Sequence, residues 1–330
     1  MAKPTVVKVL QKTSRFPYPE RFAYSPDYVF VTDAGLREYD WLVVYDEFER
    51  VEKLACPRER TILATWEPVS IKSYSKAYTR QFGHLLTNRP PDAESHPHYH
   101  LGRGYFYWFN DRDYAETASV AIPPKTELIS AVCSSKQMRH TKHFARYALV
   151  KALSEAMPEL DWYGHGVKPF GKKHEVMDPY KYHVAVENHI GVHHWTEKIA
   201  DSILSECLAF YAGDPDLGNV LPPDSFIPIP IDDPAEAVRI VKAAVASGEY
   251  ERRREAILEA KRLILTKYNF WAQVISVIES APLNSQHSTL HPQSSNLLYP
   301  RKELRKHSLS AALEDGWWHL RQYLGAVKLG

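Results

Sequence analysis

The sequence predicts an α/β fold with a doubly wound parallel sheet, and three observations support this prediction. Strand-like and helical segments alternate regularly from Glu127 onward, which is typical of parallel strands joined by crossover helices. Short apolar runs, two of them ending next to acids, occupy the N-terminal part. The chain has 330 residues, which is enough for two domains that each bury a core.

The composition is that of an ordinary globular protein and narrows the function classes. Hydrophobic residues make up 44%, charged residues 25%, and the formal net charge is +1, so bulk binding to nucleic acid or a membrane surface is not expected. Three widely spaced cysteines without a CxxC motif favour reduced thiols. We find no signal-peptide core and no run approaching the roughly 20 apolar residues of a spanning helix. We therefore expect a cytoplasmic protein.

The first domain is expected over residues 1–122 and begins with short strands. These strands are expected at 6–9, 28–32, 41–45 and 62–65. The last two end next to acids, Asp46 and Glu67. Acidic residues are common in turns after strands, so local structure alone explains most of them.

The proline pair after Ile122 marks the expected start of a second domain, over residues 123–280. Its strands are expected at 128–133, 160–163, 182–187, 208–212 and 226–229, and its helices at 141–156, after Thr196, from Asp233, and across 250–280. Residues 281–330 are expected to form a linker and a C-terminal helix over 304–329. We expect this helix to pack back on the first domain, with peripheral contact to the inner membrane as the alternative.

The segment from Tyr180 to Phe226 organises the second domain as strand, loop, helix and strand. Its helix places Ile199 and Ile203 on one apolar face, and Thr196 is the expected N-cap. The loop before the helix leaves the carboxyl edge of a parallel sheet. At such an edge a helix N-terminus offers unpaired N–H groups to an anion, so a phosphate fits there.

This loop carries side chains suited to a nucleotide diphosphate. Glu187 and Asn188 end the strand, and Glu197 and Lys198 stand in the first helical turn. A carboxylate can accept hydrogen bonds from two ribose hydroxyls, and a lysine can meet a pyrophosphate. The alternative is a solvated Glu–Lys pair at the start of an ordinary helix.

Three runs in this region read YKYHVAVEN, TEKIADSILSECLAFYAG and PPDSFI. In composition and spacing they resemble the donor-binding motif of the family 10 glycosyltransferases, the α1,3/4-fucosyltransferases. His194 stands where that family usually has a tyrosine, and His193 and Trp195 are also atypical. The resemblance implies a bacterial-type enzyme with a GT-B fold, in which two Rossmann-like domains face a central cleft. It also implies inverting transfer of L-fucose from GDP-fucose to an oligosaccharide hydroxyl, in lipopolysaccharide or glycan biosynthesis.

The resemblance implies that the residues of this chain at the family's donor-binding positions bind the donor here as well. They are Glu187, Asn188, His194, Glu197 and Lys198. A further donor-binding residue comes from the run CSSKQMRHTKHFARYALVKAL, which resembles a family loop followed by an arginine seven residues before a leucine. Arg146 has that position, and its guanidinium could meet the charge on the leaving diphosphate. Lys136, Arg139 and Lys142 are the other basic residues nearby.

The resemblance also proposes a catalytic base in the first domain. The run TWEPVSIKSYS resembles the family's Glu-Ser-Pro motif, in which a glutamate at a strand end is the candidate base. Glu67 has this position, although Pro68 follows it directly without an intervening serine. Asp46 and Glu94 are the next candidates for the base.

No metal site and no required cofactor are expected, although Mn or Mg could stimulate the reaction. Asp214 and Asp216 look like a DxD metal motif, but they lie in a Gly-Asp-Pro turn context that explains them locally. The alternating His96, His98 and His100 lack a further ligand at a familiar zinc spacing, which favours a solvated or acceptor-lining loop.

Two other functions stay open at this stage. A GT-B glycosyltransferase that uses a different nucleotide sugar would account for the atypical loop from His193 to Trp195. A catalytically silent carbohydrate-binding homologue is the other alternative, against which the retained Glu67 and Arg146 argue. The expected partners are a nucleotide sugar and an oligosaccharide acceptor, and no nucleic acid.

Overall fold

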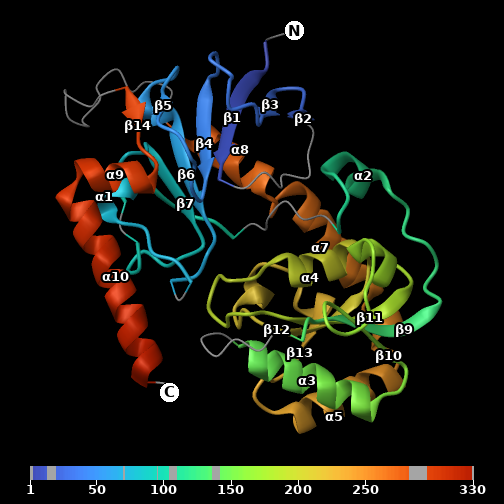
Figure 1. Ribbon diagram of the computed structural model, residues 1–330. Coiled ribbons are helices and arrows are strands. Elements are labelled where there is room, and N and C mark those ends of the chain that lie inside the picture. The colour runs from blue at the N-terminus through green and yellow to red at the C-terminus, as the bar shows by residue number, and fades with distance from the viewer. Residues whose placement is uncertain are drawn as a thin grey trace. The chain divides into compact units, whose positions relative to one another are not determined.

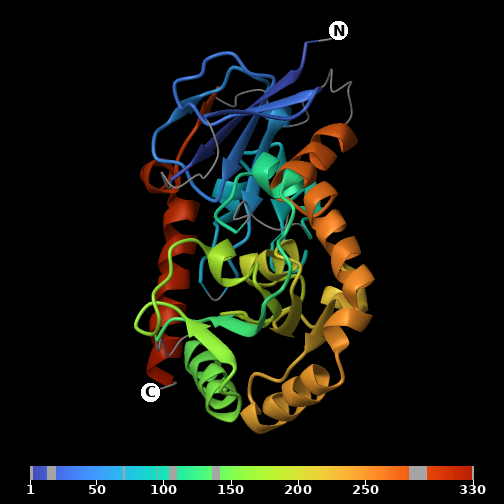
Figure 2. The same cartoon turned by 90° about the vertical axis from the view of Figure 1, so that its right-hand side faces the viewer.

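Two largely parallel sheets, one in each of two units, organise the chain (Figures 1 and 2). The structure is a computed structural model that describes residues 3–12, 20–69, 71–94, 96–103, 110–135, 142–281 and 296–328. The first unit comprises Met1–Gly102 with Trp271–Gly330, and the second comprises Arg103–Phe270. Both units layer helices on a sheet, which confirms the predicted α/β class with two Rossmann-like domains.

The first unit contains a seven-stranded sheet with the order β2-β3-β1-β4-β6-β7-β8. Only the edge pair of β2 and β3 is antiparallel. Strands β1, β4 and β6 are covered on both faces, so nearly all of their residues are buried. The strands are β1 (Thr5–Gln11), β2 (Arg21–Ser25), β3 (Tyr28–Val31), β4 (Trp41–Tyr45), β6 (Thr61–Thr65), β7 (His84–Thr87) and β8 (Tyr99–Leu101).

Helices from both ends of the chain cover this first sheet. They are α1 (Lys76–Thr79), α8 (Phe270–Ser280), α9 (Arg301–His307) and α10 (Leu309–Lys328), with the 3-10 turn η1 (Arg58–Arg60). On one face, Trp271 of α8 packs against Phe30, with 4.5 Å between the ring centroids. On the other face, Tyr78, Leu304 and Ala311 join the core (Figure 1). A short antiparallel pair, β5 (Glu52–Lys53) with β14 (Leu297–Leu298), also attaches the C-terminal segment.

The second unit contains a five-stranded sheet, ordered β10-β9-β11-β12-β13, in which every pair is parallel. The strands are β9 (Glu127–Val132), β10 (Leu160–Tyr163), β11 (Tyr180–Val186), β12 (Leu208–Ala212) and β13 (Phe226–Pro228). The helices are α2 (Tyr114–Ser119), α3 (His143–Ala156), α4 (Glu197–Leu204), α5 (Pro234–Ala246), α6 (Glu249–Arg252) and α7 (Arg254–Thr266), with the turns η2 (Lys173–Val176), η3 (Leu217–Asn219) and η4 (Pro223–Ser225). Helices α3 and α5 lie side by side on one face of the sheet, and α4 and α7 lie on the other (Figures 1 and 2).

Local sequence signals set the helix starts of the second unit. The Thr196 side chain accepts a hydrogen bond from the backbone N–H of Lys198 at the start of α4. Asp233 caps α5 through the backbone N–H of Glu236, and Pro234 occupies the first helical position. Both caps are at the residues that the sequence predicts.

Two long predicted helices are broken in the structure. The expected helix over 250–280 is three helices, α6 to α8, with breaks at Arg253 and after Thr266. At the second break, Asn269 donates to the carbonyls of Ile264 and Leu265 and so ends α7. The expected C-terminal helix is α9 and α10, separated at Ser308, whose extended backbone interrupts the helical path. The side-chain hydroxyl of Ser308 accepts from Ala311 N and starts α10.

The units divide at other places than the expected domains do. Residues 103–122 were expected in the first domain but lie in the second unit. They attach there through polar contacts, since Arg112 pairs with Asp178 at 2.6 Å and the Tyr114 hydroxyl donates to the Leu265 carbonyl at 3.0 Å. Most of the expected linker after residue 280, and the basic residues Lys136 and Arg139, lie outside the described residues.

Over the part of α10 whose side chains are described, one side packs against the rest of the first unit. Ala311 and Asp315 on that side are buried. The opposite side is apolar and exposed, at Leu309, Leu313, Trp317, Leu320 and Leu324. In the described part of the chain, none of the helices combines the length and the apolar character needed to span a bilayer.

Candidate active site

A cavity of about 360 Å³ lies at the carboxyl edge of the second sheet, beside the N-terminus of α4. Four of the six predicted donor-binding residues line it. They are Arg146, Asn188, Glu197 and Lys198. The segments that meet there are the ends of β9 and β11, the first turns of α3 and α4, and η2. This is the place at which open parallel sheets bind their ligands.

Glu187, the fifth predicted donor residue, does not line the cavity. Its side chain is fully buried, and its two carboxylate oxygens accept from Thr196: the backbone N at 2.9 Å and the hydroxyl at 2.6 Å. Burial raises the pKa of Glu187, partly offset by the charge of Lys198. Glu187 therefore fixes the N-terminus of α4 in place.

Lys198 stands between two carboxylates at this helix start. Its Nζ lies 3.3 Å from Glu187 Oε2 and 2.8 Å from Glu197 Oε1. Burial alone would lower the pKa of Lys198, but these two acids raise it, so the lysine stays charged. Burial would likewise raise the pKa of Glu197, but Lys198 and then Lys173 bring it down to about 2. The cavity thus presents fixed charges of both signs.

Arg146 brings a cation from α3 whose charge is not fully engaged. Its residue is 7% exposed, Nη1 donates to Asn188 Oδ1, and Nη2 donates to the Val132 carbonyl at 3.5 Å. Among the described residues, the buried Nε–H has no acceptor, and none of the ion pairs includes Arg146. A buried guanidinium without an acid is costly unless an anion joins it. This geometry suits a phosphate group.

The lining residues that were not predicted from the sequence include Lys173, His183 and Asp201. Lys173 Nζ lies 2.8 Å from Asp201 Oδ2. Burial raises the pKa of Asp201 to about 7, against the pull of Lys173, and burial lowers the pKa of His183 to about 3. Asp201 follows Glu197 by four residues and so shares its side of α4, a signal that the sequence did contain.

The atypical loop before α4 does not line this cavity. Trp195 is 2% exposed and belongs to the buried interior. His194, the sixth predicted donor residue, packs edge-on against His189 with 5.2 Å between the ring centroids. His193 has a left-handed backbone, with φ of 63°, and its Nδ1 lies 3.8 Å from Asp216 Oδ2.

In the first unit, Glu67 lies two residues after the end of β6, at the carboxyl edge of the sheet, and it is exposed. Arg89 donates to the Glu67 carbonyl from Nε at 2.9 Å and from Nη2 at 2.7 Å. The other two acids considered for the catalytic base are held in ion pairs. Asp46 pairs with Lys72 at 2.5 Å, and the buried Glu94 pairs with Arg89 at 2.8 Å.

The segments considered for metals have local structural roles. Asp214 Oδ1 accepts from the Asp216 backbone N at 2.9 Å, which forms a turn. His100 Nε2 lies 3.1 Å from His84 Nδ1, and His96 Nε2 lies 3.2 Å from the Phe82 carbonyl. Across the described ranges, no three His, Cys, Asp or Glu side chains form a group that could hold a metal ion.

Residues 122–242 match the sequence profile described as glycosyltransferase family 10 (fucosyltransferase), C-terminal part. The resemblance to glycosyltransferase family 10 that the sequence predicts is therefore confirmed over this segment. The matched segment includes every residue that lines the cavity. Each of the two units has the Rossmann-like α/β architecture that the predicted GT-B fold requires. A comparison with curated proteins gives no match.

Solved structures similar to the chain include α1,3-fucosyltransferases. One is 14% identical, with 87% of this chain and 93% of that chain covered, at a TM-score of 0.49. A second, with GDP-fucose, is 16% identical, with 81% and 92% covered, at 0.48. A third, with GDP, is 16% identical, with 83% and 94% covered, at 0.49.

Proposed function

We propose that this protein transfers L-fucose from GDP-fucose to a hydroxyl of an oligosaccharide, with inversion at the transferred carbon. One observation carries the proposal. In a segment of glycosyltransferase family 10, a sheet-edge cavity holds Arg146, Lys198 and the N-terminus of α4 together. Three positive features at one point suit the diphosphate of a nucleotide sugar.

In this proposal each charged group has a defined task. The Arg146 guanidinium, with its unengaged Nε–H, and the Lys198 ammonium stabilise the negative charge that grows on the leaving GDP. Glu197 stays ionised and accepts hydrogen bonds from ribose hydroxyls. Glu67 takes the proton from the acceptor hydroxyl, which attacks opposite the diphosphate in one displacement. No covalent intermediate forms.

A different nucleotide sugar is the second candidate, because His194 stands where the family usually has a tyrosine. The position of this loop bears on the choice of donor. Trp195 is buried, and His193 and His194 lie outside the cavity lining. The unusual residues therefore act on the loop's own packing, which favours GDP-fucose over a changed donor. A silent homologue is the third candidate, and the charged lining argues against it.

Nucleotide binding provides the first test of the donor. We expect GDP and GDP-fucose to raise the unfolding temperature, while UDP, ADP and CMP at equal concentration leave it nearly unchanged. A ligand at a hundred times its Kd stabilises the folded state by about 2.7 kcal/mol, which is readily measured by differential scanning fluorimetry. Selective stabilisation by UDP would move the assignment to the second candidate, and a flat response to all four nucleotides would contradict both.

Metal removal provides an independent prediction. We expect fucose transfer to continue in EDTA, because Arg146, Lys198 and the α4 N-terminus supply the positive charge that a metal ion would otherwise bring. The rate is measured with and without EDTA, and again after adding Mn²⁺. Complete loss that Mn²⁺ restores would contradict this expectation and would make Asp214 and Asp216 candidate ligands, to be tested as asparagine variants.

A further inference from the structure

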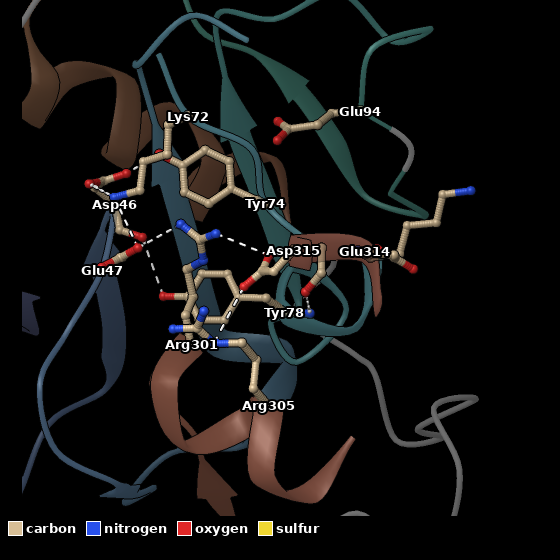
Figure 3. Close-up of polar contacts among 12 residues, drawn as sticks. Asp46, Glu47, Lys72, Tyr74, Tyr78, Glu94, Arg301, Arg305, Glu314 and Asp315 are labelled. Carbon is tan, nitrogen blue, oxygen red and sulfur yellow. Dashed lines mark hydrogen bonds and ion pairs between the residues drawn. The ribbon is translucent and has the colours of Figure 1, made fainter. Parts of the chain in front are cut away.

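In the first unit, the C-terminal helices reach a loop at the carboxyl edge of the sheet (Figure 3). Arg301, the first residue of α9, donates from Nη1 to Glu47 Oε1 at 2.7 Å. The same guanidinium donates from Nη2 to Asp315 Oδ1 of α10 at 3.1 Å. The three side chains are 13%, 13% and 4% exposed. One arginine therefore ties the loop after β4 to both helices.

The loop after β4 is held in an unusual conformation. Asp46 has a φ of 60°, a region that residues other than glycine seldom adopt. Lys72 joins Asp46 Oδ2 at 2.5 Å and Glu47 Oε1 at 3.0 Å, and the Tyr74 hydroxyl donates to Asp46 Oδ1. Figure 3 shows these groups converging with Arg301. Strained backbone held by several partners is typical of functional sites.

The contacts continue to the segment that carries Glu67. Arg89 donates to the Lys72 carbonyl at 2.7 Å and, twice, to the Glu67 carbonyl. The ring of Tyr74 lies close to two guanidiniums, 4.7 Å from that of Arg89 and 5.5 Å from that of Arg301. A continuous set of polar contacts thus runs from α10 to the backbone of the proposed base.

We propose that Arg301 is a positioning residue for the acceptor side of the transfer, and that α9 and α10 hold the loops after β4 and β6 in their working geometry. This inference rests on the proposed function. The helices already have an apolar anchor in Leu304 and Ala311. Partly buried ion pairs add little net stability compared with apolar packing, so we assign these pairs to holding the loop geometry.

The chain offers a closely matched control for Arg301. Arg305 lies on the same helix and also approaches Asp315, at 3.6 Å, but its side chain is 41% exposed. Among the described contacts, it makes none with Glu47. Arg301→Ala and Arg305→Ala therefore remove the same side chain from the same helix, and only the first disconnects the loop after β4.

The kinetic test varies acceptor concentration at saturating GDP-fucose. For Arg301→Ala we expect kcat/KM for the acceptor to fall by about ten- to a hundredfold, the size of effect that a small misplacement of reacting groups produces. GDP affinity should stay within about twofold, and Arg305→Ala should resemble the wild type in both respects. Equal values of kcat/KM in the two variants, or an equal loss of GDP affinity and acceptor use in Arg301→Ala, would overturn the inference.

Hydrogen exchange gives a second readout that does not depend on fucose transfer. The Asp46 N–H donates to the Ala64 carbonyl at 2.8 Å, and the Lys72 N–H donates to the Pro68 carbonyl at 3.0 Å. We expect faster exchange at both amides in Arg301→Ala and unchanged exchange in Arg305→Ala. Unchanged exchange in both variants would overturn the inference even if the wild type proves to transfer fucose. If the wild type transfers none, the proposed function fails while exchange still decides the role of Arg301.

A conservative variant covers the case in which Arg301→Ala does not fold. Arg301→Lys keeps the charge but replaces the planar fork with one ammonium nitrogen, so Glu47 and Asp315 are no longer met by two nitrogens held in fixed directions. We expect it to fold and to show the same pattern of lost acceptor use and faster exchange, in a smaller amount. Wild-type behaviour of Arg301→Lys would show that charge alone suffices and would contradict a bridging role.

Discussion

Glu67→Gln is expected to lower kcat by about 10² to 10⁴, the usual contribution of a positioned general base. Glutamine keeps the size and hydrogen bonding of the side chain but cannot take a proton from the acceptor hydroxyl. Because Glu67 is exposed, the change should alter the free energy of unfolding by no more than about 0.5 kcal/mol. The measurement is the initial rate with GDP-fucose and an oligosaccharide panel, at saturating concentrations of both substrates.

Two controls make this result specific. GDP affinity should equal that of the wild type, because Glu67 and the nucleotide cavity lie in different units. Glu49→Gln removes another exposed carboxylate from the first unit and should leave kcat unchanged. If Glu67→Gln turns over at nearly the wild-type rate, the base lies elsewhere. Asp46→Asn and Glu94→Gln would then be tested, although both acids are held in ion pairs.

The sequence predicted those features of the fold that depend on residues close together in the chain, such as strand limits and helix N-caps. The strand from Trp41 to Tyr45 has its predicted limits, because a run of five apolar residues rich in β-branched and aromatic side chains is too short for a helix and typical of a buried strand. The N-caps Thr196 and Asp233 were predicted because a cap and its helix are adjacent in sequence. Edge strands such as β8, with only three partly exposed residues, carry too weak a pattern to detect.

The rest of the site depends on contacts between distant segments. Arg301 and Glu47 are 254 residues apart, and Lys173 and Asp201 are 28 apart, so no local spacing connects them. Glu187 shows a second limit of inferring a role from the position of a residue in the sequence. Its position at a strand end suggested a ligand contact, whereas burial and two hydrogen bonds to Thr196 use both carboxylate oxygens. Only the folded chain shows which acids face a cavity and which ones hold a helix start.

The second large effect is expected for Lys198→Met, which should weaken GDP binding roughly ten- to a hundredfold, the cost of about 1.5 to 3 kcal/mol for one charged hydrogen bond. It should also destabilise the fold by about 3 to 5 kcal/mol, because Glu187 is left charged and unpaired in the interior. Lys181→Met, which breaks a surface pair with Glu251, should cost no more than about 1 kcal/mol. Isothermal titration and denaturant unfolding measure the two quantities.

The double variant Lys198→Met with Glu187→Gln separates binding from folding. Glutamine can still accept from Thr196 but carries no charge, so we expect most of the lost stability to return while GDP affinity stays low. The pH dependence of the free energy of unfolding provides a check on the single variant Lys198→Met. Because the pKa of Glu187 is raised in the folded state, folding favours its protonated form, and the destabilisation of Lys198→Met should shrink as pH falls toward that raised pKa. Full recovery of GDP affinity in the double variant would show that Lys198 only neutralises Glu187, and would remove it from the donor site.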